Sequence, residues 1–169
     1  MALHPNFPES PHDILDPEIR WFPADEAMRE STMDKLIPPL VALLRKKVKE
    51  FRDSGYAGAS ETSRSLLNWW FETPHLLPQA NGTMQEFQYF FAQREALETV
   101  IYLTDVVGVK DKHDMMRFDS SGLVSANMFD ESWRRFVIKM ATGSGKTKVM
   151  SLVLAWSFYH KLYEPESGL

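Results

Sequence analysis

The chain has 169 residues, of which 44% are hydrophobic and 12% aromatic, a composition typical of globular rather than disordered proteins. Its formal net charge of −4 supplies no overall basic field, so a nucleic-acid partner cannot be inferred from charge. The absence of cysteine excludes disulfides and cysteine-ligated zinc sites.

The sequence contains no pattern typical of a secreted or membrane protein. The first residues lack a basic stretch followed by an apolar one, which a secretory signal requires. The longest apolar run, residues 149–159, is shorter than the roughly 20 residues that span a bilayer. We therefore expect a cytoplasmic protein without a membrane partner.

The first third of the chain predicts an irregular arm followed by helices. Prolines recur through residues 1–31, which favours an extended lead-in. Apolar residues at helical spacing predict a helix over 31–54, ending before Gly55. Its basic face fits a solvated surface better than a nucleic-acid contact, because acidic residues follow in the same helix. A second helix is predicted over residues 60–72.

The middle of the chain predicts one long helix and then an insertion. Thr83 and Glu86 have the spacing of a capping box, which predicts a helix from there to about residue 104. Gln93 and Arg94 lie in the middle of its apolar face. Periodicity is then lost over residues 105–134, which predicts a surface insertion.

The most informative stretch follows this insertion. Residues 135–140 are a short apolar run and predict a strand, while residues 148–163 predict a helix that is apolar on nearly all sides. Between them runs Met140-Ala141-Thr142-Gly143-Ser144-Gly145-Lys146-Thr147. Strand, glycine-bearing turn and Lys-Thr opening a helix form the context of a phosphate-binding (Walker A) loop.

The chemistry of such a loop requires these residue types in this order. Glycines allow the backbone to turn tightly, so that successive N–H groups face one anion, and the helix dipole adds to the attraction. Lys146 would reach the β- and γ-phosphates, and the Thr147 hydroxyl would be a ligand of Mg²⁺. The sequence therefore predicts a nucleotide-binding loop with Mg²⁺ as a cofactor. The predicted binding residues are Ala141, Thr142, Gly143, Ser144, Gly145, Lys146 and Thr147.

Two stretches resemble a known family. Residues 136–147, with Met140 where the strict loop pattern has glycine, resemble motif I of helicase-like ATPases of the second superfamily. Residues 90–101 resemble the upstream segment whose glutamine reads adenine. The resemblance is closest to the res subunit of type III restriction enzymes and to DEAD/DEAH-type helicases. It implies that the bound nucleotide is ATP and that Gln93 contacts the adenine edge, because a carboxamide donates and accepts together.

The resemblance also implies an architecture and partners. It predicts an α/β fold in which a helix-rich region, residues 1–82, precedes the first part of a RecA-like ATPase domain, residues 83–169. The chain would be an N-terminal fragment that stops after the motif I helix. It further implies a parent DNA helicase or translocase that acts on DNA, with a modification methyltransferase subunit as a second partner.

Catalysis is not predicted for this chain by itself. No counterpart of the family's motif II carboxylates or of its motif VI arginine follows Thr147, and phosphoryl transfer needs these groups together. We therefore assign no catalytic residue. Two alternatives stay open: another P-loop NTPase or kinase, and a helical protein-interaction module with a non-functional loop.

Overall fold

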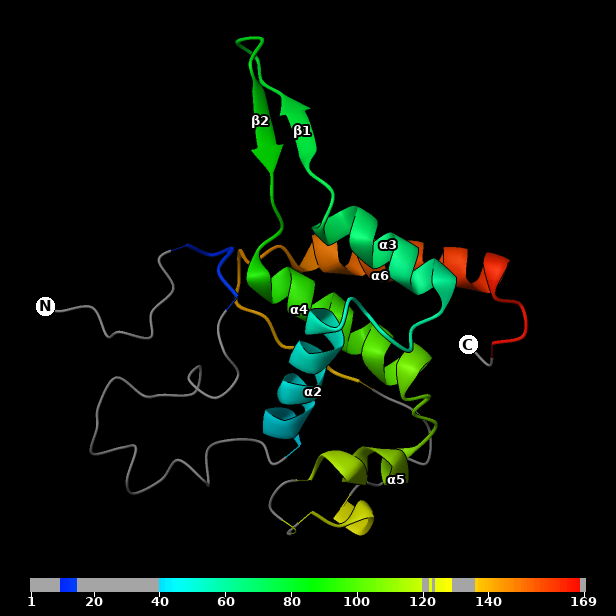
Figure 1. The fold of residues 1–169 in the computed structure, drawn as a ribbon. Helices are drawn as coiled ribbons and strands as arrows, with labels where there is room; N and C mark the ends of the chain where they lie inside the picture. Colours follow the sequence, from blue (N-terminus) through cyan, green and yellow to red (C-terminus); the bar gives the residue numbers. More distant parts are fainter. Residues whose placement is uncertain (1–9, 15–39, 120–121, 123, 129–135, 168–169) are drawn as a thin grey trace, which may run out of the picture.

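The computed structural model describes residues 10–14, 40–119, 122, 124–128 and 136–167. It is an assembly of helices from which one β-hairpin projects (Figure 1). The helices are α2 (Val41–Asp53), α3 (Glu61–Phe71), α4 (Phe91–Ile101), α5 (Lys112–Met115) and α6 (Lys146–Tyr163), and the strands are β1 (His75–Pro78) and β2 (Met84–Phe87). A π-helical turn, Tyr102–Val106, continues α4, and single 3-10 turns occupy Met116–Phe118 and Ala126–Met128.

Helix α2 ends where the sequence predicts. Gly55 has a φ of +66°, its N–H donates to the carbonyl of Arg52, and the N–H of Tyr56 donates to that of Phe51. This is the hydrogen-bond pattern of a Schellman motif, in which a left-handed residue satisfies the last carbonyls. The predicted helix is confirmed from Val41 onward, and residues 31–39 lie outside the described part of the chain.

Helix α3 is confirmed as well, and its first turn is tied to the core. The hydroxyl of Ser60 caps the helix by accepting the N–H of Ser63 at 3.2 Å. The buried hydroxyl of Ser63 in turn accepts the indole N–H of Trp156, on α6, at 2.8 Å. The cap residue therefore also helps to position α3 against α6.

The predicted helix from residue 83 to about 104 is wrong at its start. Residues Met84–Phe87 form β2, which pairs antiparallel with β1, and the helix begins only at Phe91. Thr83 does not cap a helix, because both its N–H and its hydroxyl donate to the side-chain oxygen of Asn81 within the hairpin turn. Pairing with a strand that the sequence did not predict overrides the local capping signal.

Helix α4 lies between α2, α3 and α6 (Figure 1), and the buried apolar side chains form two clusters, of which α4 contributes to the first. The first cluster joins the ends of α2 and α3 to α4 and α6. It comprises Phe51, Tyr56, Ala59, Leu67, Leu97, Ile101, Leu152 and Trp156. The second joins α2 to the chain that follows α4 and comprises Leu44, Val48, Leu103, Val109 and Phe118.

The prediction of a strand over residues 135–140 is wrong for residues 136–140, the part that the structure describes. Residues 136–140 form no regular element, and among the described segments none pairs with them. A strand exists only where a neighbour accepts its backbone hydrogen bonds, and here Val137 and Ile138 stay 71% and 43% exposed. The expected α/β fold is thus met only in part: the described chain is helix-rich, with one small antiparallel sheet.

Helix α6 confirms the predicted helix after the loop and begins two residues earlier, at Lys146. One side is buried, through Val149, Leu152, Trp156 and His160. The opposite side carries exposed apolar residues, namely Met150, Leu154, Phe158 and Leu162. Within the described ranges, no helix has both the length and the apolar character needed to cross a membrane.

Candidate functional site

The loop of residues 141–147 is shaped by two glycines. Gly143 and Gly145 have φ values of +81° and +80°, in the left-handed region that other residues rarely adopt. Between them, the N–H and the hydroxyl of Ser144 both donate to the carbonyl of Ala141, at 3.3 and 2.6 Å. The loop therefore closes as a tight turn directly before α6.

Helix α6 begins inside this loop. The carbonyl of Gly145 accepts the N–H groups of Lys148 and Val149, at 2.9 and 3.3 Å. The N–H groups of Lys146 and Thr147 precede these and have no acceptor within the helix. They carry the positive end of the helix dipole, and the side chains of both residues are exposed. This end of α6 is suited to bind an anion.

Gln93 lies against the loop, although 51 residues separate it from Ser144. Its side chain is buried, with 6% exposed, and Nε2 donates to the carbonyl of Ser144 at 3.1 Å while Oε1 accepts the N–H of Phe90 at 3.0 Å. A Cβ at Gly145 would come within 2.0 Å of this Nε2. One N–H and one lone pair of the carboxamide are left for other partners. The structure therefore brings all eight predicted binding residues together.

A buried ionic network holds α4 in place beside this site. Glu98 is fully buried and accepts hydrogen bonds from Arg52 on α2, from Nε of Arg94 at 2.8 Å, and from the hydroxyl of Tyr56 at 2.9 Å. Burial acts to lower the pKa of Arg94, but the bond to Glu98 outweighs it and the pKa is raised. Burial, with the charge of Glu98, raises the pKa of Tyr56 as well. Both groups therefore remain donors.

Sequence reasoning missed this network, although one signal pointed to it. Arg94 stands in the middle of a predicted apolar face, and a buried guanidinium requires a counterion. The counterion lies on the same helix, at Glu98, but its second cationic partner comes from α2. No spacing in the sequence links Arg52 to Glu98, which are 46 residues apart.

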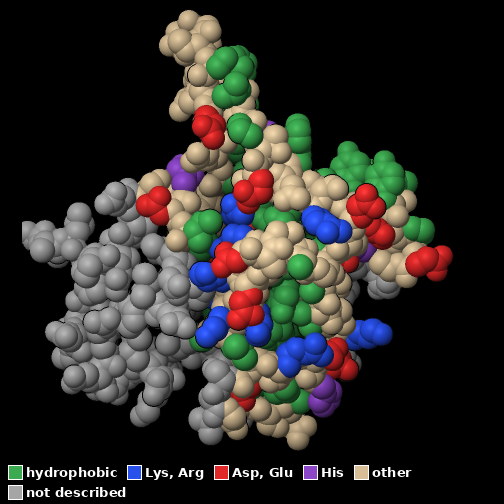
Figure 2. All heavy atoms as spheres, viewed as in Figure 1, with side chains coloured by type: hydrophobic (Ala, Val, Ile, Leu, Met, Phe, Trp, Pro, Cys, Tyr) green, Lys and Arg blue, Asp and Glu red, His purple; other side chains and the backbone are tan. Residues whose placement is uncertain are grey.

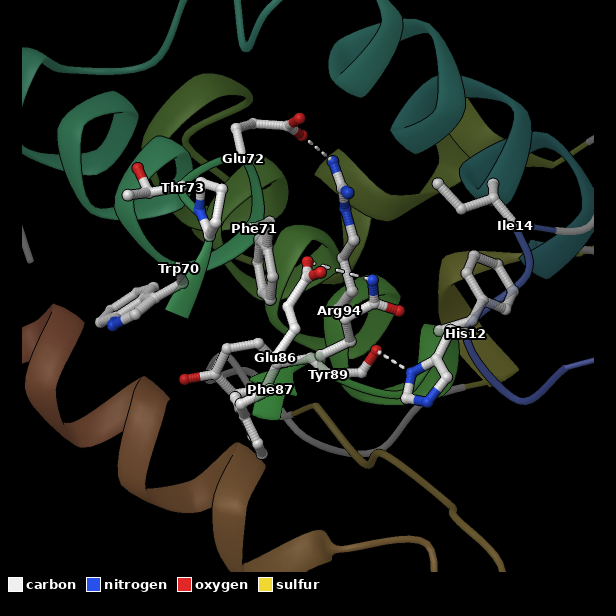
Figure 3. A pocket seen from close by; sticks show the side chains of 13 residues that line it. His12, Ile14, Trp70, Phe71, Glu72, Thr73, Glu86, Phe87, Tyr89 and Arg94 are labelled. Atoms are coloured by element: carbon white, nitrogen blue, oxygen red, sulfur yellow. Dashed lines mark hydrogen bonds and ion pairs between the residues drawn. The ribbon is translucent and has the colours of Figure 1, made fainter. Parts of the chain in front are cut away.

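A cavity of about 250 Å³ lies beside Arg94, between the end of α3 and the base of the hairpin (Figure 3). Its aromatic walls are Trp70, Phe71, Phe87, Tyr89 and Phe91. The guanidinium of Arg94 lies over the ring of Phe71 at 5.1 Å, and a hydrogen bond joins Arg94 to Glu72 at the rim. His12, from the N-terminal arm, forms another wall. Nothing in the sequence predicted that the arm reaches this position.

The loop offers few side-chain oxygen atoms as ligands for Mg²⁺. Among the described residues no three His, Asp or Glu side chains gather into a metal site. Mg²⁺ is commonly held by one or two protein oxygens together with nucleotide phosphates and waters. The exposed hydroxyl of Thr147, on the first turn of α6, fits such a site.

Comparison with known proteins gives a family match. The family model described as type III restriction enzyme, res subunit, matches residues 78–166, more than half of the chain. The chain belongs to this family. In this Res-family chain the match includes Gln93, the loop and all of α6, and it confirms the resemblance to helicase-like ATPases. Searches of curated proteins and of solved structures give no match.

Proposed function

We propose that this chain binds Mg-ATP through residues 141–147 and serves as the nucleotide-binding portion of an ATP-dependent DNA helicase or translocase of the restriction type. The observation that carries the proposal is the loop geometry. Two glycines with positive φ turn the backbone into the N-terminus of α6, where Lys146 and Thr147 are exposed. Tight turn, free N–H groups and a lysine together recognise a polyphosphate.

Each residue of the loop has a distinct task in this proposal. The backbone of Ala141 to Gly145 surrounds the phosphates, and Lys146 contacts the β- and γ-phosphates. The Thr147 hydroxyl is a ligand of Mg²⁺, which offsets the phosphate charge when bound. The remaining N–H and lone pair of Gln93 contact the adenine edge, while its other two hydrogen-bonding positions stay on Ser144 and Phe90.

The proposal extends to the longer protein. Residues 83–169 form the first part of a RecA-like domain, with 105–134 as an insertion, and residues 1–82 form an arm and a helical region. ATP turnover in a cytoplasmic parent protein drives movement along DNA, with a modification methyltransferase as partner. These 169 residues supply neither the motif II carboxylates nor the motif VI arginine, so we expect nucleotide binding without useful turnover.

Calorimetric titration with Mg-ATP and Mg-ADP tests the proposal. Lys146→Ala removes a charge-assisted bond to phosphate and should weaken binding at least about tenfold. Lys148→Ala is the matched control: it removes the same charge two residues away, from a side chain that lies over the ring of Phe87. We expect the control to change affinity by less than about threefold.

Two outcomes would count against the proposal. Equal losses in Lys146→Ala and Lys148→Ala would indicate a general charge effect rather than a built site. No binding by a wild-type chain that unfolds cooperatively in a circular dichroism melt would favour the protein-interaction alternative. The kinase alternative is disfavoured by membership in the res subunit family.

A further inference from the structure

A short segment of the N-terminal arm, residues 10–13, lies on the first turn of α4 (Figure 1). We call it the arm clamp. The carbonyl of Pro11 accepts the N–H of Phe91 at 2.9 Å, which satisfies a donor that the helix itself leaves without an acceptor. Nδ1 of His12 bonds to the carbonyl of Tyr89 at 3.0 Å (Figure 3). A carbonyl only accepts, so Nδ1 carries the proton and donates.

The arm clamp has its own internal structure. The N–H of Ser10 donates to the carboxylate of Asp13 at 2.8 Å, and the N–H of Asp13 donates back to the carbonyl of Ser10 at 3.1 Å. The half-buried His12 ring lies 5.3 Å from the ring of Phe90. The segment is therefore a closed turn with two backbone contacts and one ring contact on the start of α4.

Hydrogen bonds continue from this start to the phosphate loop. Tyr89, Phe90 and Phe91 are consecutive, and the N–H of Phe90 donates to Oε1 of Gln93. That bond fixes the carboxamide so that Nε2 faces the carbonyl of Ser144. No space remains between this Nε2 and Gly145 for even a Cβ, so a movement of Gln93 has to be accommodated by the loop.

We propose that the arm clamp positions the phosphate loop, with Gln93 as the connecting residue. His12 and Pro11 act as positioning groups: they fix the backbone of residues 89–91, which fixes Gln93, which supports Ser144 and Gly145. This proposal rests on the proposed function, because its tests measure how tightly the loop binds phosphate ligands. It predicts that the arm affects phosphate affinity even for a ligand without a base, because the connection ends at the loop backbone. Adenine nucleotides should lose at least as much affinity, because Gln93 also contacts the adenine edge in the proposed function.

Affinities for Mg-ADP, Mg-GDP and Mg-pyrophosphate test this on the full chain. His12→Ala should weaken Mg-GDP and Mg-pyrophosphate binding about threefold to tenfold, the range of one net hydrogen bond, and Mg-ADP binding by at least as much. His12→Asn places an amide N–H where the ring Nδ1 lies and should restore most of the affinity. His113→Ala, which removes an exposed histidine on α5, is the control and should leave affinity unchanged.

A double-mutant cycle tests whether the effect passes through Gln93. If it does, His12→Ala should have little further effect in a Gln93→Ala background, whereas independent residues would add. Amide NMR shifts of residues 144–146 in the ligand-free chain give a second readout. They should move in His12→Ala and return in His12→Asn, and they should not respond to His12→Ala once Gln93 is replaced.

The outcomes separate the two proposals. The amide shifts of residues 144–146 could respond to the variants as expected while the wild-type chain binds neither pyrophosphate nor nucleotide. That result would support the arm clamp and contradict the proposed function. A His12→Ala chain with a lower melting temperature but unchanged shifts and affinities would overturn the arm clamp and leave nucleotide binding intact. A loss confined to Mg-ADP would also overturn it, because the effect would then act on the base.

Discussion

Two separate constraints act on Gly145. Its φ of +80° favours glycine, and its missing Cβ leaves the space that Nε2 of Gln93 occupies. Gly143 has nearly the same φ, +81°, but a Cβ there would meet nothing within 4 Å. Substituting each glycine in turn therefore separates two costs: the backbone strain, which both positions share, and the collision with a side chain, which occurs only at Gly145.

We expect Gly143→Ala to lower the free energy of unfolding by about 1 kcal/mol, the cost of a left-handed alanine. Gly145→Ala should cost clearly more, because Gln93 must also leave Ser144. Urea denaturation of both variants measures the difference. In a Gln93→Ala background the two glycine substitutions should have similar costs. A Gly145→Ala variant no less stable than Gly143→Ala would contradict the packing described here.

Helix α4 connects the site to the rest of the molecule, because its different sides contact different parts of the structure. Gln93 contacts the loop, Leu97 and Ile101 pack in the core, and Glu98 binds arginines of α2 and of α4 itself. A helix held on several sides provides a rigid base for the loop, because each contact restricts a different direction of movement.

The two carboxylates that pair with Arg94 differ in burial, and this predicts their contributions to stability. Glu98→Gln leaves the buried guanidinium of Arg52 without the carboxylate that it pairs with, and leaves Arg94 with only the exposed Glu72. It should lower the free energy of unfolding by about 3 kcal/mol or more. Glu72→Gln removes a carboxylate that is 55% exposed and should cost less than about 1 kcal/mol. Denaturant unfolding checks both, and similar costs would contradict the assigned burial.

Helix α2 shows that charge spacing within an element is informative. Two of its three lysines pair with acids of the same helix, Lys47 with Glu50 at 2.7 Å and Lys49 with Asp53. The predicted solvated face is thereby confirmed. Figure 2 shows basic and acidic side chains interspersed over the middle of the view, without a continuous basic patch on that face. Such a mixed surface gives no support for a DNA contact there.

For the molecule as a whole, the polar centre at Asp105 ties three elements together. The carboxylate of Asp105, in the π-helical turn, accepts the N–H and the hydroxyl of Ser60, both at 2.9 Å. Its other oxygen lies 3.1 Å from Nε2 of His160 on α6, and the hydroxyl of Ser63 also faces it. Burial acts to raise the pKa of Asp105, but these hydrogen bonds together lower it below its ordinary value of 3.8.

This lowered pKa predicts a pH dependence of stability. A carboxyl whose pKa is lower in the folded state stabilises the fold above its unfolded pKa, and the contribution is lost as the pH falls through the folded pKa. We expect Asp105→Asn to be less stable than wild type at about pH 7, and the difference to shrink below about pH 4. Asp53→Asn, at an exposed site, should have little effect at either pH.

Thermal melts across this pH range measure the difference. A gap between wild type and Asp105→Asn that stays constant down to about pH 3 would show that the charge of Asp105 does not carry the effect.

The sequence by itself determined those features whose hydrogen bonds close within a few residues. The end of α2 before Gly55 and the extent of α3 were predicted closely, and the start of α6 was predicted to within two residues. The family was also readable from the chain. In each case the residues that form the feature are neighbours in sequence, so their pattern is sufficient.

Only the tertiary structure decided the features that join distant residues. The hairpin replaced a capping box because Met84–Phe87 found a partner in β1, and residues 136–140 form no strand because no described segment pairs with them. The contact of Gln93 with Ser144 and that of His12 with Tyr89 span 51 and 77 residues. Local sequence cannot specify such contacts, because each depends on where the core places two separate segments.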